Sequence, residues 1–537
     1  MPCPYRRRLI YQTSFFMSTD KSQSNLAKSA AIISLGVLSS RALGFIRDVI
    51  LANLLGTGMV AEAFFVAQRI PNLLRDLAGE GAANAAIVPV LAEYQKNKTK
   101  QEWHQLVNVL MAWALIILGC LTLLGMILAP LIVRLMAPGF IDDLAKYQLT
   151  VDLTRIMFPY LVLIALTALQ MGVLYTLHSF TAPAFSSCLL NAALIISAWA
   201  ASLFSWGMAY VLSAGVLAGG ILQLALQRGA LARLGFLWKW PSHLRHEGVV
   251  KIAKLLLPRL WGSAVYQLNI FVDTLCASFA FVVGSGGIAA IYFANRLIQL
   301  PLGVFAYALT SASLPSLSVL AAEGDHSTFK KALLFSLKNL LFILLPCAVF
   351  LCVLSPYLVQ TIFQRGAFDQ HSTYITSLVL QFLSLGLPFF GATRVMVSGF
   401  YALQDTQTSV RIATVCLLIN GILNVLLMFP LKIGGIALAS SISGLANFTM
   451  LFTTMSERLG GMRGILRKFF WRLAPCLMLM AGAMLALLEF LPLTGIVKLG
   501  IAIIVGSMSF LIGCWFFRVP ESRPLWRILR LKLKRSL

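Results

Sequence analysis

Long apolar stretches of about 20 residues alternate along the chain with short polar segments or segments rich in Gly and Pro. A helix needs about 20 apolar residues to cross the hydrocarbon core of a bilayer, so each stretch is a candidate membrane span. The pattern predicts an all-α polytopic membrane protein with fourteen transmembrane helices. Their expected centres lie near residues 42, 67, 119, 166, 195, 220, 270, 304, 345, 386, 419, 446, 480 and 505.

The connections between spans differ in charge, and this difference predicts the orientation of the chain. Lys and Arg accumulate in short cytoplasmic loops. Here they cluster after the second, sixth and twelfth spans, at residues 96–100, 228–254 and 458–472, whereas the odd-numbered connections are nearly free of them. Because the number of spans is even, we expect both termini on the cytoplasmic side.

A weak internal repeat predicts the organisation into domains. FVAQRIPNLLRDL from Phe65 resembles FANRLIQLPLGVF from Phe293. Transporters built from such parallel repeats place their site near the bilayer midplane between the two halves. We therefore expect an N-lobe and a C-lobe of six spans each, followed by two further spans. The expected bounds are 28–235 for the N-lobe, 236–248 for a cytoplasmic linker, 249–460 for the C-lobe and 461–518 for the last two spans.

Two terminal segments flank these spans. Residues 1–27 are expected to form a cytoplasmic segment, and Met17 is an alternative start of the chain. Residues 519–537 form a basic cytoplasmic tail, in which LWRILRLKLKRSL alternates basic and apolar residues. This alternation suits an interfacial helix on anionic lipid headgroups, and it equally suits a flank that only fixes the orientation of the last span.

Composition narrows the functional class. The chain has a net charge of +24, but it is 59% hydrophobic and its mean hydropathy is +0.84. The basic residues lie between apolar runs, so they favour membrane orientation over nucleic-acid binding. The cysteines lie singly without metal-ligand spacing, and there is no nucleotide-binding P-loop or nucleophile elbow. We therefore expect a transporter, not an enzyme, with no nucleic-acid partner.

Arg41 is the most informative single residue, because it lies near the centre of the first apolar run. A charge at the centre of a membrane helix costs about 2.5 to 3.5 kcal/mol, so such residues usually face a bundle interior or a water-filled cavity. The planar guanidinium suits phosphate, to which it donates paired hydrogen bonds. We expect Arg41 to contact an anionic substrate, and seven-residue spacing lets Asp48 project from the same face.

Other charges in or beside the apolar runs admit two interpretations. Arg47 with Asp48, and Arg69 with Asp76, can form mutually neutralising pairs that hold the bundle together. Arg75 and Arg296 are candidates for the same anion site, and the alternative is that they extend to lipid headgroups from span ends. Breaks at Gly and Pro, including Pro301 and Gly303, are typical of helices that bend or line a cavity.

The second half of the chain holds a candidate cation site. Asp273 is a lone carboxylate within span seven, and it suits either cation binding, proton coupling or burial as a satisfied acid. Asn420 and Asn424 share one face of span eleven, where they can add oxygen ligands or form hydrogen bonds between helices.

Several motifs together carry a resemblance to a known family. SSRALGFIRDVILANLLGTG at residues 39–58 and AEAFFVAQRIPNLLRDLAGEGAANAAIVPVLAEY at residues 61–94 closely resemble the MurJ/MviN family of bacterial lipid II flippases. The resemblance continues through APGF at Ala137, YFANRLIQLP at Tyr292 and SLPSLS at Ser313. It covers essentially the whole chain after Met17.

The resemblance implies a fold shared with multidrug and oligosaccharide exporters, with a central cationic cavity and a groove for the lipid tail beside the last two helices. It places the family's substrate-binding positions at Arg41, Arg47, Arg75, Arg296 and Glu62. It also implies a sodium site at Asp273, Asn420, Asn424 and Ser440, with an amide at one position where relatives carry a carboxylate. Around Arg296 this chain departs from the family, because Asn295 and Gln299 replace acidic residues.

The expected function is therefore the flipping of lipid II across the bacterial inner membrane by alternating access. The membrane potential, sodium and protons are candidate driving forces, and no other cofactor is expected. The expected partners are lipid II and membrane lipids, with cell-wall synthesis or division proteins as further candidates. The main rival is a cation-coupled exporter of drugs or of another polyprenyl-linked oligosaccharide on the same fold, and a second rival is a membrane scaffold that transports nothing.

Overall fold

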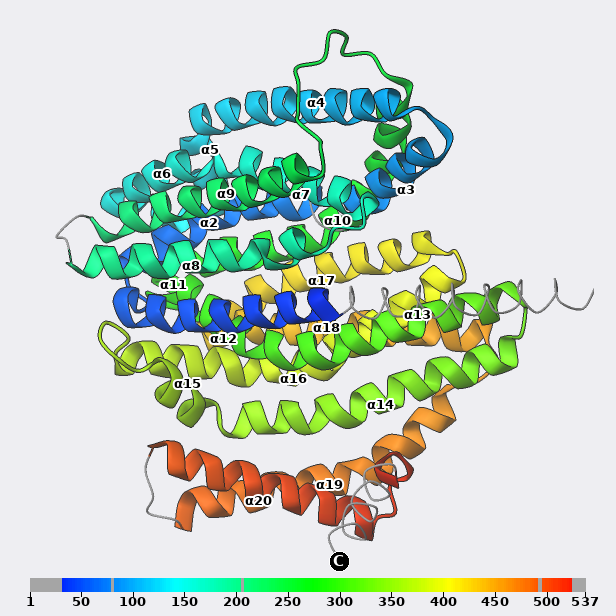
Figure 1. The fold of residues 1–537 in the computed structure, drawn as a ribbon. Helices are drawn as coiled ribbons and strands as arrows, with labels where there is room; N and C mark the ends of the chain where they lie inside the picture. Colours follow the sequence, from blue (N-terminus) through cyan, green and yellow to red (C-terminus); the bar gives the residue numbers. More distant parts are fainter. Residues whose placement is uncertain (1–30, 79–81, 204–206, 491–494, 524–537) are drawn as a thin grey trace, which may run out of the picture. The chain divides into compact units, whose positions relative to one another are not determined.

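The computed structural model describes residues 31–78, 82–203, 207–490 and 495–523, and all the regular elements in these ranges are helices (Figure 1). A helix over residues 31–55 comes first. The first half of the chain continues with α2 (Met59–Ala78), α3 (Ala82–Asn97), α4 (Lys100–Ile127), α5 (Ala129–Met136), η1 (Pro138–Phe140), α6 (Leu144–Met157), α7 (Tyr160–Thr176), α8 (Thr181–Leu203) and α9 (Met208–Arg233).

The second half is also helical. Its helices are α10 (Glu247–Ala277), α11 (Ala280–Val283), α12 (Gly287–Pro301), η2 (Leu302–Ala306), α13 (Tyr307–Ala322), α14 (His326–Val353), α15 (Ser355–Phe363), α16 (Gln370–Ala402), α17 (Thr406–Leu431), α18 (Ile433–Arg458), α19 (Arg463–Phe490), α20 (Gly495–Phe516) and η3 (Pro520–Ser522). The expected terminal segment 1–27 and the tail from residue 524 onward lie outside the described residues.

Among the described residues, 11 helical stretches are long and apolar enough to cross a membrane, counting α6 with α7 and α12 with α13 as continuous stretches. The predicted all-helical, multi-pass membrane architecture is confirmed. The three other predicted spans, centred near 42, 67 and 270, fall in the helix over residues 31–55, in α2 and in α10. Each of these helices carries charged residues, which lower its mean hydropathy.

The helices group into two compact units, and each is described on its own. Of the described residues, the first comprises 31–50, 68–78, 82–129, 152–203 and 207–261, and the second comprises 51–67, 130–151, 262–490 and 495–523. The predicted lobe boundaries differ from these ranges, because residues 51–67 and 130–151 pack with the second half of the chain. The two-lobe repeat remains a prediction.

Polar side chains cap the starts of several of the long helices. Thr99 and Glu102 form a reciprocal capping box at the start of α4. Aspartates cap three helices of the second unit, where Asp325, Asp369 and Asp405 accept hydrogen bonds from the backbone N–H groups of Thr328, Ser372 and Thr408. These side chains accept hydrogen bonds from N–H groups that have no partner within the helix, so they fix the residue at which each helix begins.

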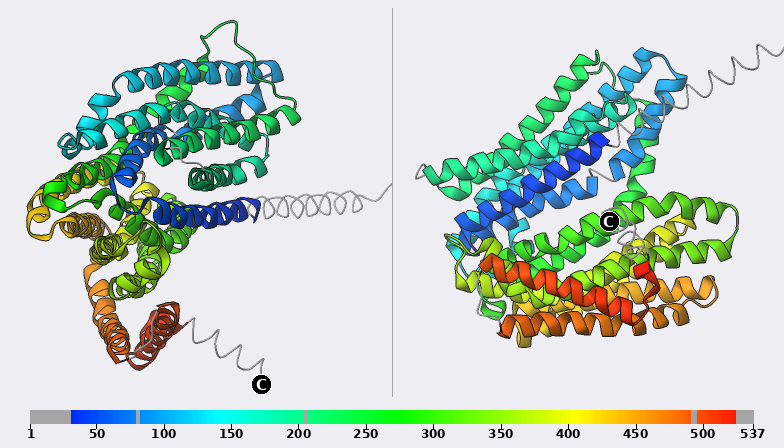
Figure 2. Two further views of the ribbon diagram at one scale, coloured as in Figure 1. Left: turned by 90° about the vertical axis from the view of Figure 1, so that its left-hand side faces the viewer. Right: turned by 60° about the horizontal axis from the view of Figure 1, so that its bottom comes forward.

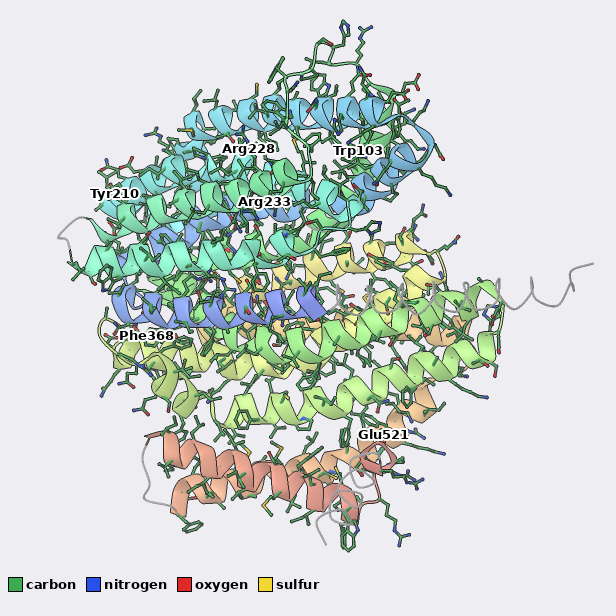
Figure 3. The ribbon with its side chains drawn as sticks, viewed as in Figure 1. Trp103, Tyr210, Arg228, Arg233, Phe368 and Glu521 are labelled. Carbon is green, nitrogen blue, oxygen red and sulfur yellow. The ribbon has the colours of Figure 1, made fainter. Side chains whose placement is uncertain are left out.

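Each unit has its own apolar core. In the first unit, Trp103 and Phe236 pack edge to face at 5.9 Å among buried aliphatic side chains of α3, α4 and α7, and Figure 3 labels Trp103. In the second unit, the ring centroid of Phe293 lies 5.3 Å from that of Phe363 and 5.5 Å from that of Phe368. Phe293 lies on α12, the helix that also carries the candidate Arg296.

The last two long helices, α19 and α20, lie side by side in both views of Figure 2. Glycines allow this close approach. A Cβ added at Gly513 would lie 3.2 Å from Cα of Cys476, and one added at Gly506 would lie 2.6 Å from the sulfur of Met484. Small residues at helix contacts are the usual means of close packing in a membrane, where no hydrophobic effect drives helices together.

Candidate functional site

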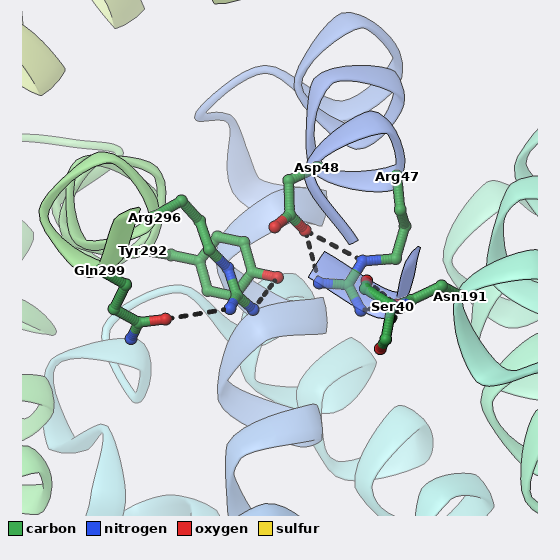
Figure 4. Close-up of polar contacts among 7 residues, drawn as sticks. All are labelled: Ser40, Arg47, Asp48, Asn191, Tyr292, Arg296 and Gln299. Atoms are coloured by element: carbon green, nitrogen blue, oxygen red, sulfur yellow. Dashed lines mark hydrogen bonds and ion pairs between the residues drawn. The ribbon is translucent and has the colours of Figure 1, made fainter. Parts of the chain in front are cut away.

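The first helix brings an arginine and an aspartate into one buried cluster of the first unit. Arg47 donates to Oδ1 of Asp48 through Nη2 at 2.6 Å and through Nε at 2.9 Å, as Figure 4 shows. Its Nη1 donates to Oδ1 of Asn191 on α8 at 2.9 Å. Asn191 in turn donates to the backbone carbonyl of Ser40 at 3.0 Å. The predicted Arg47–Asp48 pair is confirmed, and it ties the first helix to α8.

Arg41 lies on the same helix in a different environment. Its side chain is exposed in the first unit, and it has no hydrogen bond or ion pair with any residue that the structure describes. Asp48 pairs with its neighbour Arg47 instead, so the same-face spacing of Arg41 and Asp48 does not produce a contact. The donors of Arg41 are therefore available to a ligand.

Arg296 lies on α12 in the second unit. Its Nη2 donates to the hydroxyl of Tyr292 at 2.8 Å, and its Nη1 lies 3.4 Å from Oε1 of Gln299 (Figure 4). The guanidinium also lies over the Tyr292 ring, at 4.6 Å from the centroid. Tyr292 and Gln299 are both neutral, and they orient the guanidinium of Arg296.

A π-helical turn follows this arginine directly. Residues Leu302–Ala306 form η2 between α12 and α13, immediately after Pro301. Proline removes a backbone N–H and forces the helix to deviate, and single π-helical turns are frequent at functional sites. At the predicted break at Pro301 and Gly303 the chain stays helical, and the irregularity there is this single π-helical turn.

Glu62, a predicted substrate ligand, is buried at the first turn of α2. Its Oε2 accepts from Nζ of Lys146 at 2.5 Å, and its Oε1 accepts from the backbone N–H of Ile288 at 3.0 Å. Both carboxylate oxygens therefore have protein partners in this conformation. Lys146 was not singled out from the sequence, because its partner lies 84 positions away.

Two charges that the sequence singles out belong to the later part of α2. The side chains of Arg75 and Asp76 lie outside the described residues. The assignment of Arg75 to the anion site and the pairing of Arg69 with Asp76 therefore stay predictions.

Arg394 was missed by the sequence reasoning, although it is an arginine within the apolar span of α16. It lies over the ring of Tyr307, at 4.0 Å from the centroid. The signal that identifies Arg41, an arginine inside an apolar run, also applies to Arg394.

The predicted cation cluster does come together in the second unit. Asn420 and Asn424 on α17 each donate to Oδ1 of Asp273 on α10, at 2.8 and 2.7 Å. Ser440 on α18 donates to Oδ2 of Asp273 at 3.1 Å. The Oδ1 atoms of both asparagines are buried without a hydrogen-bond partner among the described residues. These oxygens are of the type that a hard cation prefers, so the residues present fit sodium.

This geometry also shows what binding would require. The two amide N–H groups now point toward the carboxylate, where they satisfy it by hydrogen bonding. Because amide N and O atoms are assigned from the hydrogen-bond network, rotation of either amide by half a turn would present Oδ1 instead. Among the described residues there is no group of three or more His, Cys, Asp or Glu side chains that could hold a metal.

The helical spans define a multi-pass membrane protein, and buried charges inside such a protein are typical of a transporter. A family model described as "Lipid II flippase MurJ" matches residues 51–506. A probable lipid II flippase of Vibrio cholerae is 33% identical over 504 residues, with 89% of this chain and 94% of that protein covered. One from Rhizobium tropici is 35% identical over 442 residues, with 81% of each chain covered. The chain belongs to the MurJ lipid II flippase family.

Solved structures agree with this assignment. The structure described as "Lipid II flippase MurJ, inward closed conformation" is 27% identical, covers 91% of this chain and 99% of its own, and has a TM-score of 0.77. An inward-facing multidrug transporter of the MATE family has a TM-score of 0.67 at 14% identity, covering 78% of this chain and 94% of its own, and it shows a shared fold alone. The family is one of transporters and not of enzymes, as the sequence predicts.

Proposed function

We propose that this chain flips lipid II from the cytoplasmic to the outer face of the bacterial inner membrane. Membership of the lipid II flippase family supports the substrate. The observation that carries the mechanism is Arg41, an intramembrane guanidinium that is exposed and has no partner among the described residues. A diphosphate is the anionic part of such a lipid, and a guanidinium is its natural hydrogen-bonding partner.

The proposed binding site consists of Arg41, Arg47, Arg75 and Arg296. The hydrogen bonds from Arg296 to Tyr292 and Gln299 support its assignment, since they hold the guanidinium in a fixed orientation. Arg47 has a weaker case, because Asp48 offsets its charge. We place Arg41 first among the four, and we propose that the others bind the headgroup with it when the cavity faces the cytoplasm.

The proposed topology has fourteen spans in two lobes of six, with α19 and α20 added beside a groove for the lipid tail. Both termini are cytoplasmic in this proposal, because the basic loops follow even-numbered spans. The membrane potential would favour outward movement of the substrate. One charge moved across 100 mV is worth about 2.3 kcal/mol, so an outward-moving diphosphate of about two negative charges would gain about twice that.

We further propose that sodium binding at Asp273 is coupled to the transport cycle. The site would use both oxygens of Asp273, the hydroxyl of Ser440 and the amide oxygens of Asn420 and Asn424. The buried amide oxygens without hydrogen-bond partners among the described residues support this proposal. A bound sodium ion would supply positive charge that holds α10, α17 and α18 together around one carboxylate. Proton binding by Asp273 is the alternative.

The first experiment is complementation of a bacterium depleted of its own lipid II flippase. The wild-type chain, Arg41→Ala and Arg41→Lys would be expressed at matched membrane abundance. Outward exposure of lipid II would be measured through its cleavage by an externally added enzyme. We expect wild type to restore exposure, Arg41→Ala to lose at least about tenfold and Arg41→Lys to retain part, because lysine keeps the charge but not the planar fork.

The matched control is Arg411→Ala, which removes another exposed arginine at the start of α17. This variant should behave as wild type. If the wild-type chain restores no exposure despite good expression, the lipid II assignment fails and an exporter of other amphiphiles gains support. If Arg41→Ala restores full exposure, the flippase assignment stands and Arg41 is not its anion ligand.

A further inference from the structure

An ion pair is buried in the second unit where several helices begin. Nζ of Lys146 on α6 lies 2.5 Å from Oε2 of Glu62 on α2, and their side chains are only 9% and 3% exposed. Both residues follow connections that are predicted to lie outside the cell, the turn at residues 56–58 and the segment at 137–143. The pair is therefore placed at the outer ends of its helices.

The same two side chains hold two further segments. Oε1 of Glu62 accepts from the backbone N–H of Ile288 in the first turn of α12 at 3.0 Å. Nζ of Lys146 lies 3.9 Å from the centroid of the Phe140 ring in η1. In the predicted domain organisation α2, η1 and α6 belong to the N-lobe and α12 to the C-lobe. A movement that parts the lobes at their outer ends must break the bond between Glu62 and Ile288.

Three neutral contacts also join segments near helix ends in this unit. The hydroxyls of Thr57 and Ser372 lie 2.8 Å apart and are buried. Ala367 donates its backbone N–H to the carbonyl of Asn53 at 2.8 Å. Gly139 donates its backbone N–H to Oγ of Ser278 at 3.1 Å. These contacts join the segments by hydrogen bonding, and Glu62 with Lys146 adds a pair of opposite charges.

A buried ion pair has energetics that differ from those of these neutral contacts. The attraction between the two charges is largely offset by the cost of removing both from water, so the intact pair adds little net stability. When the outer ends part, water can solvate both charges, and the cost of separating them is partly recovered. Removal of one charge alone destabilises the closed arrangement strongly, because the remaining charge is then buried without its partner.

We propose that Glu62 and Lys146 are a positioning pair that closes the outer end of the transporter and lets it reopen. This inference rests on the proposed alternating-access function, because only a chain that opens outward needs a contact that breaks readily. In this proposal Glu62 acts by holding α2, α6 and α12 together while the outer end is closed. It is not a ligand of the headgroup in that state.

The proposal predicts opposite effects for a single and a double substitution. Lys146→Met leaves the Glu62 carboxylate buried and unpaired, so the closed outer end becomes less favourable and the open form gains population. Glu62→Gln combined with Lys146→Met removes both charges, while the side-chain carbonyl of the substituted glutamine can still accept from the N–H of Ile288. The closed outer end is then retained, and it opens less readily because no charge gains hydration on opening.

A disulfide between Thr57→Cys and Ser372→Cys reports closure without any need for substrate. The two hydroxyls are in contact, so cysteines at these positions should cross-link under mild oxidation when the outer end is closed. The pair would be introduced into the full chain after its native cysteines are replaced, and labelling of Thr57→Cys alone by a membrane-impermeant maleimide would report opening. Purified protein of each variant would first be checked for a single monodisperse species.

We expect Lys146→Met to lower the cross-linking yield about threefold or more and to raise maleimide labelling. The double variant should cross-link at least as well as the parent and label less. Lys251→Met is the matched control, because Lys251 forms an ion pair with Glu93 at 2.6 Å in which both side chains are about half exposed. Loss of such an exposed pair should change neither the cross-linking yield nor the maleimide labelling.

Two results would overturn the proposal. One is an unchanged cross-linking yield in a well-folded Lys146→Met variant. The other is an equal fall in the single and double variants, which indicates that the pair only supports folding. Failure of the proposed lipid II function is recognised separately, since complementation by the wild-type chain would then fail while the cross-linking pattern of the variants could still appear as expected.

Discussion

Asn424 donates a hydrogen bond of 2.7 Å to Asp273, although the two residues lie 151 positions apart in the chain. Asn420, one helical turn earlier, donates to the same carboxylate oxygen at 2.8 Å. The i, i+4 spacing of the two asparagines puts both amides on one face of α17. This face meets α10 at Asp273, so one carboxylate organises the contact between these helices.

The first prediction concerns Asp273→Asn, which removes the negative charge from this cluster. If sodium binds here, the variant should lose the stimulation of flipping by sodium, with at least about a tenfold loss of apparent sodium affinity. Flipping would be followed in proteoliposomes at varied sodium and constant ionic strength. Ser440→Ala should cause a smaller loss, because it removes a single neutral ligand. An unchanged sodium response in Asp273→Asn would exclude the site.

The second prediction concerns the buried pair of Arg47 and Asp48. Arg47→Met leaves Asp48 buried without its closest charge partner, which we expect to cost about 3 to 5 kcal/mol of stability. The double variant Arg47→Met with Asp48→Asn should recover most of that stability. Thermal unfolding of the detergent-purified proteins measures the stability of the single and the double variant. If the double variant is stable but inactive in complementation, Arg47 contacts the substrate, whereas full activity would limit it to a structural role.

The third prediction concerns the start of α17, at a connection between spans. Thr408 donates to Asp405 through its backbone N–H at 3.0 Å and through its hydroxyl at 2.6 Å, and Arg458 lies 2.6 Å from Oδ2. These hydrogen bonds from Thr408, together with Arg458, lower the pKa of Asp405 from 3.8 to about 2. Replacement of the cap in Asp405→Ala should cost about 1 to 2 kcal/mol at neutral pH.

The sign of the pH dependence follows from that lowered pKa. The Asp405 carboxylate stabilises the folded state fully above its ordinary pKa of 3.8, and this contribution is lost as the pH falls toward about 2. The difference in unfolding temperature between wild type and Asp405→Ala should therefore be constant from about pH 5 to 8 and shrink between about pH 4 and 2. A difference that grows with acidification would contradict the assigned role of Asp405.

The fourth prediction concerns the tight turn between the first helix and α2. Gly56 has a φ of +56°, and an added Cβ would lie 2.2 Å from the carbonyl oxygen of Ala367. Gly56→Ala should therefore lower stability by about 2 kcal/mol or more, since the strained φ and the steric overlap act together. Gly119→Ala is the control, because nothing lies within 4 Å of a Cβ there and alanine favours a helix.

Sequence patterns identified interactions between residues that are close in the chain, but they missed interactions between residues that are far apart in it. The Arg47–Asp48 pair joins adjacent residues, and the spacing of Asn420 and Asn424 is a property of one helix, so both are visible in the sequence. The partner of Glu62 was not found, because Lys146 lies 84 positions away and resembles an ordinary loop-end lysine. Arg394 was overlooked although its apolar surroundings resemble those of Arg41.

The sequence by itself determined the helices, their apolar surfaces and the residues whose charge requires explanation inside a membrane. It did so because helix formation and bilayer insertion depend on runs of neighbouring residues. Only the tertiary structure decided which charges are neutralised and which remain available. Glu62 is enclosed by Lys146 and Ile288, while Arg41 is exposed without a partner among the described residues. Packing sets these outcomes, because burial and pairing depend on segments that are distant in the chain.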